Sequence, residues 1–147
     1  MAGEWTLLYD RDCGFCRWSL AKVLAWDRGR RLRPAALQDP EADELLADTD
    51  GKGNMESWHL VSPDGDVRSA GTAIGPLMRL LPGGAPIAAI AERFPRATKR
   101  AYRWVADHRS AFGRRIGERA RARADAQIRQ REGGGDRSAA APDTSDY

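Results

Sequence analysis

The feature that constrains the fold most is the stretch LYDRDCGFCRW, residues 8–18, which holds both cysteines of the chain between two different hydrophobic patterns. Residues 4–9, EWTLLY, combine aromatic, aliphatic and β-branched side chains, and this composition predicts a short buried strand. From Gly14 to about Asp27 the apolar residues recur at spacings near three and four, which predicts a helix that Gly29 ends. The cysteine pair is therefore expected at a strand-to-helix junction.

Two further elements follow before the middle of the chain. Residues 30–37, RRLRPAAL, predict a second strand, and Pro34 favours an edge position or a bulge because proline cannot donate to a ladder. Pro40 is expected in the first turn of a second helix, with Asp39 as its N-cap. The apolar residues of this helix that we expect to face inward are Leu45, Leu46 and Ala47.

The second half of the pattern predicts a hairpin and then helices. Residues 57–62 and 66–70 predict two strands, and Asp64-Gly65 between them is a strong hairpin signal. Thr72 is predicted to cap a third helix that ends at Leu81. Two more helices are expected over residues 86–94 and 97–112, where Tyr102, Trp104 and Val105 would form a packing face. Trp5, Trp18 and Trp26 are expected in or near the core.

The order of these elements defines a fold class. A strand–helix–strand unit forms a parallel pair with a right-handed crossover, and the hairpin adds antiparallel strands to the same sheet. The prediction is an α/β, thioredoxin-like fold with a four-stranded mixed sheet (β-α-β-α-β-β-α) and extra C-terminal helices. We divide the chain into a domain over residues 1–112, a basic helical extension over 113–132 and a disordered tail over 133–147, which is rich in Gly, Ser, Ala and Asp.

The position of the two cysteines gives them a chemistry. A helix N-terminus carries partial positive charge and unpaired N–H groups, both of which favour a thiolate. Cys13 is therefore the candidate nucleophile that attacks a disulfide, and Cys16 is the candidate resolving thiol that attacks the mixed disulfide. This reaction uses no cofactor. It needs a disulfide-containing protein or small thiol compound as substrate and a dithiol as electron donor.

Other roles for these residues stay open at this stage. The cysteines could be small buried residues, or ligands of a zinc ion, although only His59 and His108 remain as further ligands and their spacing is not that of a zinc finger. Asp10 either accepts a proton from the resolving thiol or caps the helix, and Asp12 is interpreted as a cap.

These residues also carry a resemblance. Asp10-x-x-Cys13-x-x-Cys16 after LLY, together with HLVSPDGDVRSAGTAI and YRWVADHR, resembles the DCC family of predicted thiol-disulfide oxidoreductases over about residues 5–110. The resemblance implies a thioredoxin-like fold and protein-disulfide reductase activity. It assigns the motif to Asp10, Cys13 and Cys16, and it also matches Gly71 and Arg109. Arg11 stands where glycine is common in the family, and His108 where asparagine is common.

One part of a thioredoxin-like site is missing from the sequence. Such enzymes carry a proline just before the first hairpin strand, and counting back from Asp64-Gly65 puts this position near Ser57. There is no proline between Pro40 and Pro63. We therefore expect Ser57 or Trp58 to offer backbone to a substrate chain, and we interpret His59 as a half-buried strand residue.

The charge and composition limit the kinds of partner that we expect. The net charge is +3, but residues 96–131 alone hold 12 Lys or Arg against 3 Asp or Glu. Few aromatic residues interleave with these charges, so we interpret the extension as a solvated helix and nucleic acid as an unlikely partner. No apolar stretch is long enough for a membrane span, and no signal peptide precedes the first strand, which predicts a cytoplasmic protein. The rival to an enzyme is a redox-inert binding module that presents this basic extension to an acidic partner.

Overall fold

The computed structural model describes residues 3–47 and 58–139. Its sheet has four strands in the order β2-β1-β3-β4. Their bounds are β1 Trp5–Tyr9, β2 Leu32–Ala36, β3 His59–Val61 and β4 Val67–Ser69. β1 pairs with β2 in parallel and with β3 antiparallel, and β3 pairs antiparallel with β4. The predicted mixed sheet is confirmed, and Pro34 lies in the edge strand β2 as expected.

Six helices accompany this sheet in the described part of the chain. Their bounds are α1 Gly14–Trp26, α2 Pro40–Leu46, α3 Gly71–Leu80, α4 Ala85–Arg93, α5 Pro95–Arg115 and α6 Glu118–Ala139. The predicted turn between β3 and β4 is present, since Gly65 has a φ of 94° and Ser62 N–H donates to Asp66 O at 2.9 Å. The fold is the thioredoxin-like α/β class that the element order predicts.

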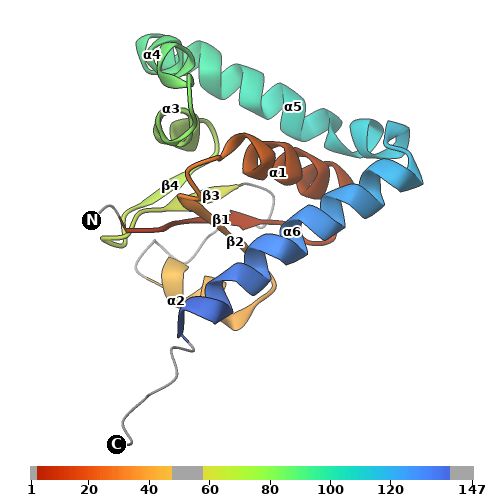
Figure 1. The fold of residues 1–147 in the computed structure, drawn as a ribbon. Coiled ribbons are helices and arrows are strands. Elements are labelled where there is room, and N and C mark those ends of the chain that lie inside the picture. The colour runs from red at the N-terminus through yellow and green to blue at the C-terminus, as the bar shows by residue number, and fades with distance from the viewer. Residues whose placement is uncertain (1–2, 48–57, 140–147) are drawn as a thin grey trace, which may run out of the picture.

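The two faces of the sheet are covered by different helices. On one face Leu7 and Tyr9 of β1 contact a core formed with α1, α3 and α6. On the other face Leu8 and Val61 contact Ala42 of α2. Figure 1 shows α4 and α5 outside α3 and α1, on the side of these helices that faces away from the sheet. The cysteine-bearing start of α1 therefore lies between the sheet and the outer helices.

The basic extension is part of the body of the protein, which corrects the prediction of a solvated helix. α6 lies along α1 and crosses toward β2 (Figure 1), and its Ala124 and Ile128 are each only 4% exposed. Ile128 joins the same core as Leu7 and Leu24. The helix continues to Ala139, seven residues beyond the predicted end of the extension at residue 132. Residues 140–147 of the predicted tail lie outside the described residues, and the domain boundaries stay predictions.

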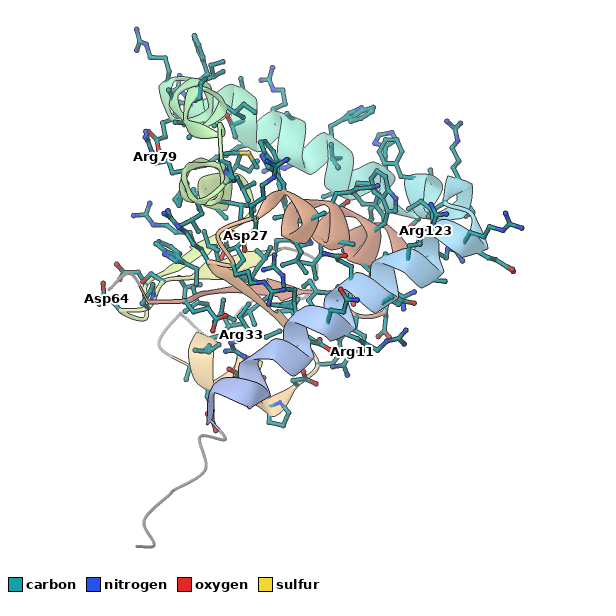
Figure 2. The ribbon with its side chains drawn as sticks, in the orientation of Figure 1. Arg11, Asp27, Arg33, Asp64, Arg79 and Arg123 are labelled. Atoms are coloured by element: carbon teal, nitrogen blue, oxygen red, sulfur yellow. The ribbon has the colours of Figure 1, made fainter. Side chains whose placement is uncertain are left out.

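A buried ion pair joins α6 to the end of α1. Asp27, which is fully buried, accepts hydrogen bonds from Arg31 N–H at 3.1 Å and Leu32 N–H at 3.0 Å. Arg131 donates through Nη1 to Asp27 Oδ2 at 3.0 Å and through Nη2 to the carbonyls of Leu24 and Asp27, both at 2.7 Å. Figure 2 shows Asp27 in the interior, whereas the labelled Arg79 and Arg123 lie at the periphery. Arg131 thus satisfies the open carbonyls at the C-terminus of α1.

Several local predictions are corrected by the structure. Thr72 does not cap α3, because the helix already begins at Gly71 and the Thr72 hydroxyl donates to Ser69 O at 2.6 Å. Trp26, expected in or near the core, is 37% exposed, and Trp104, expected in a packing face of its helix, is 55% exposed. Ala47, predicted to face inward, is exposed, whereas Leu45 and Leu46 do pack against the α2 face of the core.

The close approach of two helices explains the glycine at the start of α3. A Cβ added to Gly71 would lie 3.0 Å from Lys99 Cα of α5, which is tighter than most Cβ contacts in proteins and would push the two helices apart slightly. The resemblance had pointed to Gly71, and the structure supplies the steric reason. Within residues 3–47 and 58–139, none of the helices combines the length and apolar character that crossing a bilayer requires.

Candidate redox site

Cys13 lies at the junction between β1 and α1, as the sequence predicts. It is the N-cap residue of α1, with extended backbone angles (φ −91°, ψ 109°). Its Sγ accepts a hydrogen bond from the backbone N–H of Cys16 at 3.2 Å. Cys13 is partly exposed and Cys16 is buried, and neither forms a disulfide. The sulfur of Cys13 therefore takes the place of the oxygen that normally caps a helix.

This environment makes Cys13 acidic. The side-chain hydrogen bond with Cys16 lowers the pKa of Cys13 most, and the backbone N–H of Cys16 and the positive charge of Arg109 lower it further. Burial and the negative charge of Asp10 oppose this shift. The net result is a Cys13 pKa of about 6, compared with an ordinary value of 9.0. At neutral pH Cys13 is therefore mainly a thiolate.

Cys16 is held in the opposite state. Its hydrogen bond to Cys13 raises the pKa of Cys16 most, followed by burial and by the charge of the Cys13 thiolate. At neutral pH Cys16 is therefore a protonated thiol that donates to its neighbour. The two cysteines differ as the nucleophile and the resolving thiol of an exchange reaction must differ.

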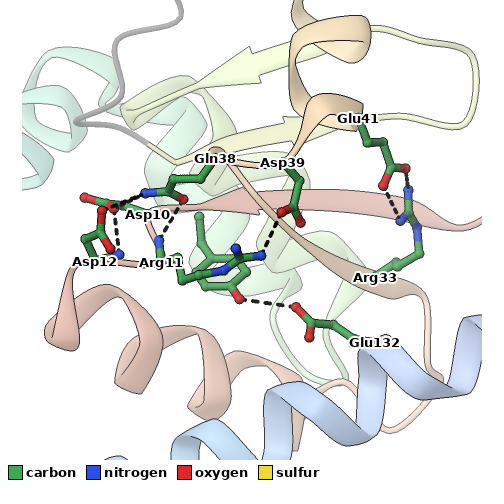
Figure 3. A network of polar contacts seen from close by, with 9 residues as sticks. Asp10, Arg11, Asp12, Arg33, Gln38, Asp39, Glu41 and Glu132 are labelled. Carbon is green, nitrogen blue, oxygen red and sulfur yellow. Dashed lines mark hydrogen bonds and ion pairs between the residues drawn. The ribbon is translucent and has the colours of Figure 1, made fainter.

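The two aspartates of the motif shape the turn before the helix and do not cap it. Asp10 Oδ1 accepts from Asp12 N–H at 2.9 Å and from Gln38 Nε2 at 2.8 Å (Figure 3). Gln38 Nε2 also reaches Asp12 Oδ2 at 3.4 Å. The interpretation of Asp12 as the cap is wrong, because Cys13 occupies that position. Asp10 is near enough for its charge to raise the pKa of both cysteines.

Arg11 directs its charge away from the cysteines. Its Nη2 pairs with Asp39 Oδ1 at 2.8 Å, as Figure 3 shows, and its backbone N–H donates to Gln38 Oε1 at 3.2 Å. Asp39 is the N-cap residue of α2, as predicted, but its side chain makes no capping hydrogen bond there. The departure from the family pattern at position 11 thus ties the site loop to the start of α2.

Two cavities of different character meet at the cysteines. A polar cavity of about 420 Å³ has Cys13 in its wall, together with Asp10, Asp12, Arg17, Arg109, Arg114 and Arg121. An apolar cavity of about 340 Å³ has Cys16 in its wall, together with Phe15, Val23, Trp58, Leu77, Met78 and Tyr102. Arg109 borders both cavities. The resemblance pointed to Arg109, but Arg17 and Arg121 were not singled out in the sequence.

The predicted substrate contacts are placed only in part. Ser57 lies outside the described residues. Trp58 N–H already donates to the Tyr102 hydroxyl at 3.0 Å, and Trp58 O accepts from Ala70 N–H at 3.0 Å. Both backbone groups of Trp58 thus already have a partner within the protein, and Trp58 also lines the apolar cavity beside Cys16, so its predicted contact with a substrate stays a prediction.

The two histidines are not among the residues that line the two cavities at the cysteines. His59 is 2% exposed, more buried than predicted, and its Nδ1 is 2.6 Å from the Ser69 hydroxyl. His108 stacks on Trp104 with ring centroids 4.5 Å apart. Among the residues that the structure describes, no three His, Cys, Asp or Glu side chains gather in a group that could hold a metal ion.

A four-stranded mixed sheet with a Cys-x-x-Cys pair at the first strand-to-helix junction defines a thioredoxin-like protein of the thiol-disulfide exchange class. Comparison with protein families then gives a match to the DCC1-like thiol-disulfide oxidoreductase family over residues 7–115. The chain belongs to this family. Neither the curated proteins nor the solved structures gave a match.

Proposed function

We propose that the protein is a thiol-disulfide oxidoreductase of the protein-disulfide reductase type, with Cys13 as nucleophile and Cys16 as resolving thiol. The observation that carries this proposal is the opposite shift of the two thiol pKa values, downward to about 6 for Cys13 and upward for Cys16. A structural cysteine pair has no need of such a difference. A dithiol reductase needs one reactive thiolate and one thiol that stays protonated until the mixed disulfide has formed.

In the first step the Cys13 thiolate attacks one sulfur of a substrate disulfide, RS–SR′. A bond forms between Cys13 Sγ and the sulfur of R, the substrate S–S bond breaks, and R′S⁻ leaves and takes a proton from solvent. Cys13 then carries no charge. The hydrogen bond to the thiolate and its charge, two of the causes that raise the Cys16 pKa, are thereby removed, and Cys16 becomes easier to ionise.

In the second step Cys16 loses its proton and attacks Cys13 Sγ. The Cys13–Cys16 disulfide forms and RS⁻ leaves, so two electrons pass from the cysteine pair to the substrate. We assign the Asp10 carboxylate as the group that accepts the Cys16 proton, because its charge acts on both cysteines. A dithiol donor, as a cytoplasmic setting supplies, would then reduce the pair again.

The apolar cavity is the proposed contact for the substrate chain next to its disulfide. Trp58 and Cys16 share the wall of this cavity, and Ser57 directly precedes Trp58 in the chain. An extended substrate segment with an apolar side chain beside its cysteine fits such a surface better than a polar one.

The test is a redox titration against a dithiol buffer, with the Cys13–Cys16 disulfide read by mass spectrometry. Incubation with a peptide disulfide should oxidise the pair, Cys16→Ser should accumulate a mixed disulfide on Cys13, and Cys13→Ser should form no adduct. A redox-inert binding module, the alternative, would give no adduct in any variant and would bind its partner equally well after Cys13→Ser.

A further inference from the structure

The wall of the polar cavity beside Cys13 contains more positively charged than negatively charged side chains. Its wall contains four arginines, Arg17, Arg109, Arg114 and Arg121, against two carboxylates, Asp10 and Asp12. Of these arginines only Arg109 contributes to the low pKa of Cys13. Gln38 Nε2 donates to both carboxylates, to Asp10 Oδ1 at 2.8 Å and to Asp12 Oδ2 at 3.4 Å, and so links them in the loop that precedes α1.

Two of the arginines have donors without an acceptor. Nε of Arg17 and Nε of Arg121 are both buried and have no hydrogen-bond partner among the described residues. Other atoms of the same side chains are occupied, since Arg17 Nη1 is 3.5 Å from Asp125 Oδ1 and Arg121 Nη2 donates to Gly113 O at 2.7 Å. Burying a charged N–H donor without a partner is costly, so the protein satisfies these two guanidinium groups incompletely, and a negative charge beside them would be stabilising.

Arg121 Nε lies close to the first turn of α1, next to Cys13. A Cβ placed on Gly14, the residue after Cys13, would be 3.9 Å from Arg121 Nε. The end of α5 closes the same region, because a Cβ on Gly113 would be 3.5 Å from Phe15 N. An anionic group bound to Arg17 and Arg121 would therefore sit beside the first turn of α1, within reach of a disulfide that Cys13 attacks.

From this geometry we propose that the preferred small substrate is an anionic thiol compound in its disulfide form, with a carboxylate on each half. This inference rests on the proposed function and names the substrate class of the same site. The carboxylate pairs with the guanidinium charges of Arg17 and Arg121 in the cavity wall and places its sulfur beside Cys13. A cavity of about 420 Å³ has room for a ligand of this size. Cys13 Sγ then bonds to one sulfur, and the carboxylate-bearing thiolate of the other half leaves.

The experiment compares three disulfides of similar size and different charge: 3,3′-dithiodipropionate (anionic), 2-hydroxyethyl disulfide (neutral) and cystamine (cationic). The rate of mixed-disulfide formation on Cys13 is measured with the Cys16→Ser protein, so that each adduct accumulates and is counted by mass spectrometry. We expect the anionic disulfide to react fastest and the cationic one slowest. The anionic-to-neutral ratio should fall about tenfold in Arg121→Gln and in Arg17→Gln, which lose a charge-assisted hydrogen bond.

The matched control is Arg119→Gln, which removes the same charge from an exposed position of α6 that is not part of the cavity wall. It should keep the anionic-to-neutral ratio of the parent. Thermal unfolding of each variant checks its fold, and because Arg17 and Arg121 lie on different helices, one variant tests the proposal if the other does not fold.

A ratio near one in the parent protein would overturn this inference and leave the proposed function standing. An equal loss of the ratio in Arg119→Gln would overturn it as well, because the preference would then come from net charge alone. If none of the three disulfides formed an adduct on Cys13, the proposed function itself would fail.

Discussion

The two ends of helix α1 hold their polar groups in opposite ways. At the N-terminus Cys13 is partly exposed, and the neighbouring arginines keep two buried Nε–H donors without a protein acceptor. At the C-terminus Asp27 is fully buried, and Arg31, Leu32 and Arg131 all donate to its carboxylate. Helix α6 contacts both ends, through Arg121 at the first and Arg131 at the second. Arginines of the same helix thus line a cavity beside Cys13 at one end and stabilise the fold at the other.

The largest expected effect comes from removing the Arg131–Asp27 ion pair at the C-terminus of α1. Arg131→Met should lower the free energy of unfolding by about 3–5 kcal/mol, because it leaves the Asp27 carboxylate buried without its cation. Urea unfolding of the reduced protein measures this loss. Arg129→Met, at an exposed position of the same helix, is the control and should change stability by less than about 0.5 kcal/mol. Equal losses in the two variants would mean that the backbone N–H groups alone hold Asp27.

At the N-terminus of α1, the reactivity of Cys13 should depend on pH. Iodoacetamide should label Cys13 with a rate that rises through a midpoint of about 6, whereas Cys16 should stay unlabelled at neutral pH because its pKa is raised. Peptide mass spectrometry after timed labelling distinguishes the two sites. Faster labelling of Cys16 would reverse the assigned roles.

The same pKa shift predicts a change in stability with a definite sign. The Cys13 pKa falls from 9.0 in the unfolded chain to about 6 in the folded protein, so the thiolate stabilises the fold fully above about pH 9. This contribution is lost as the pH falls through about 6. The stability of the reduced protein relative to Cys13→Ser should therefore rise between these two values, as urea unfolding at several pH values would show. A flat difference would contradict the shift.

A smaller effect should come from the charges around the thiolate, and its direction should depend on the residue. Asp10→Asn should lower the labelling midpoint of Cys13, because the Asp10 charge raises that pKa, whereas Arg109→Gln should raise the midpoint. Thiolate absorbance against pH measures both. Asp12→Asn is the matched control, since Asp12 is not among the groups that shift the Cys13 pKa. If Asp10→Asn also slows release of a trapped mixed disulfide, Asp10 accepts the Cys16 proton as proposed.

The smallest effect is expected from shortening α6. A chain that ends after residue 132 keeps Ile128 and Arg131 and loses only a segment of low hydrophobicity, so its melting temperature should change by less than about 2 °C. A chain that ends after residue 127 loses both anchors and should not fold stably. A large destabilisation from the first truncation would show that residues after 132 also pack against the body.

The sequence predicted the elements whose signals are local. The hairpin at Asp64-Gly65, the helix after Cys13 and the edge strand with Pro34 each depend on a few neighbouring residues, and all three are confirmed. The cap of α1 was missed even though it is local. Asp12 is the better capping residue by preference, but Asp10 engages the Asp12 backbone in the preceding turn and leaves the cap position to Cys13.

The role of α6 was not predictable from its pattern. Ile128 is an isolated aliphatic residue in a stretch dominated by Arg and Ala, so no amphipathic face is visible, although the small Ala124 lets the helix lie close to α1. The Arg131–Asp27 pair joins residues 104 positions apart, and nothing near either residue indicates its partner. The candidate site was predicted in its cysteines and incompletely in its arginines for the same reason.

The long separation between Asp27 and Arg131 has a consequence for biosynthesis. A ribosome completes the strand–helix unit with both cysteines about a hundred residues before it adds the arginine that closes the end of α1. Until then the α1 surface that α6 covers in the finished protein lacks its partner, and Cys13 lacks the wall that Arg121 supplies. Since contacts between distant residues form late, the nascent chain carries its thiols before the finished protein can set their reactivity.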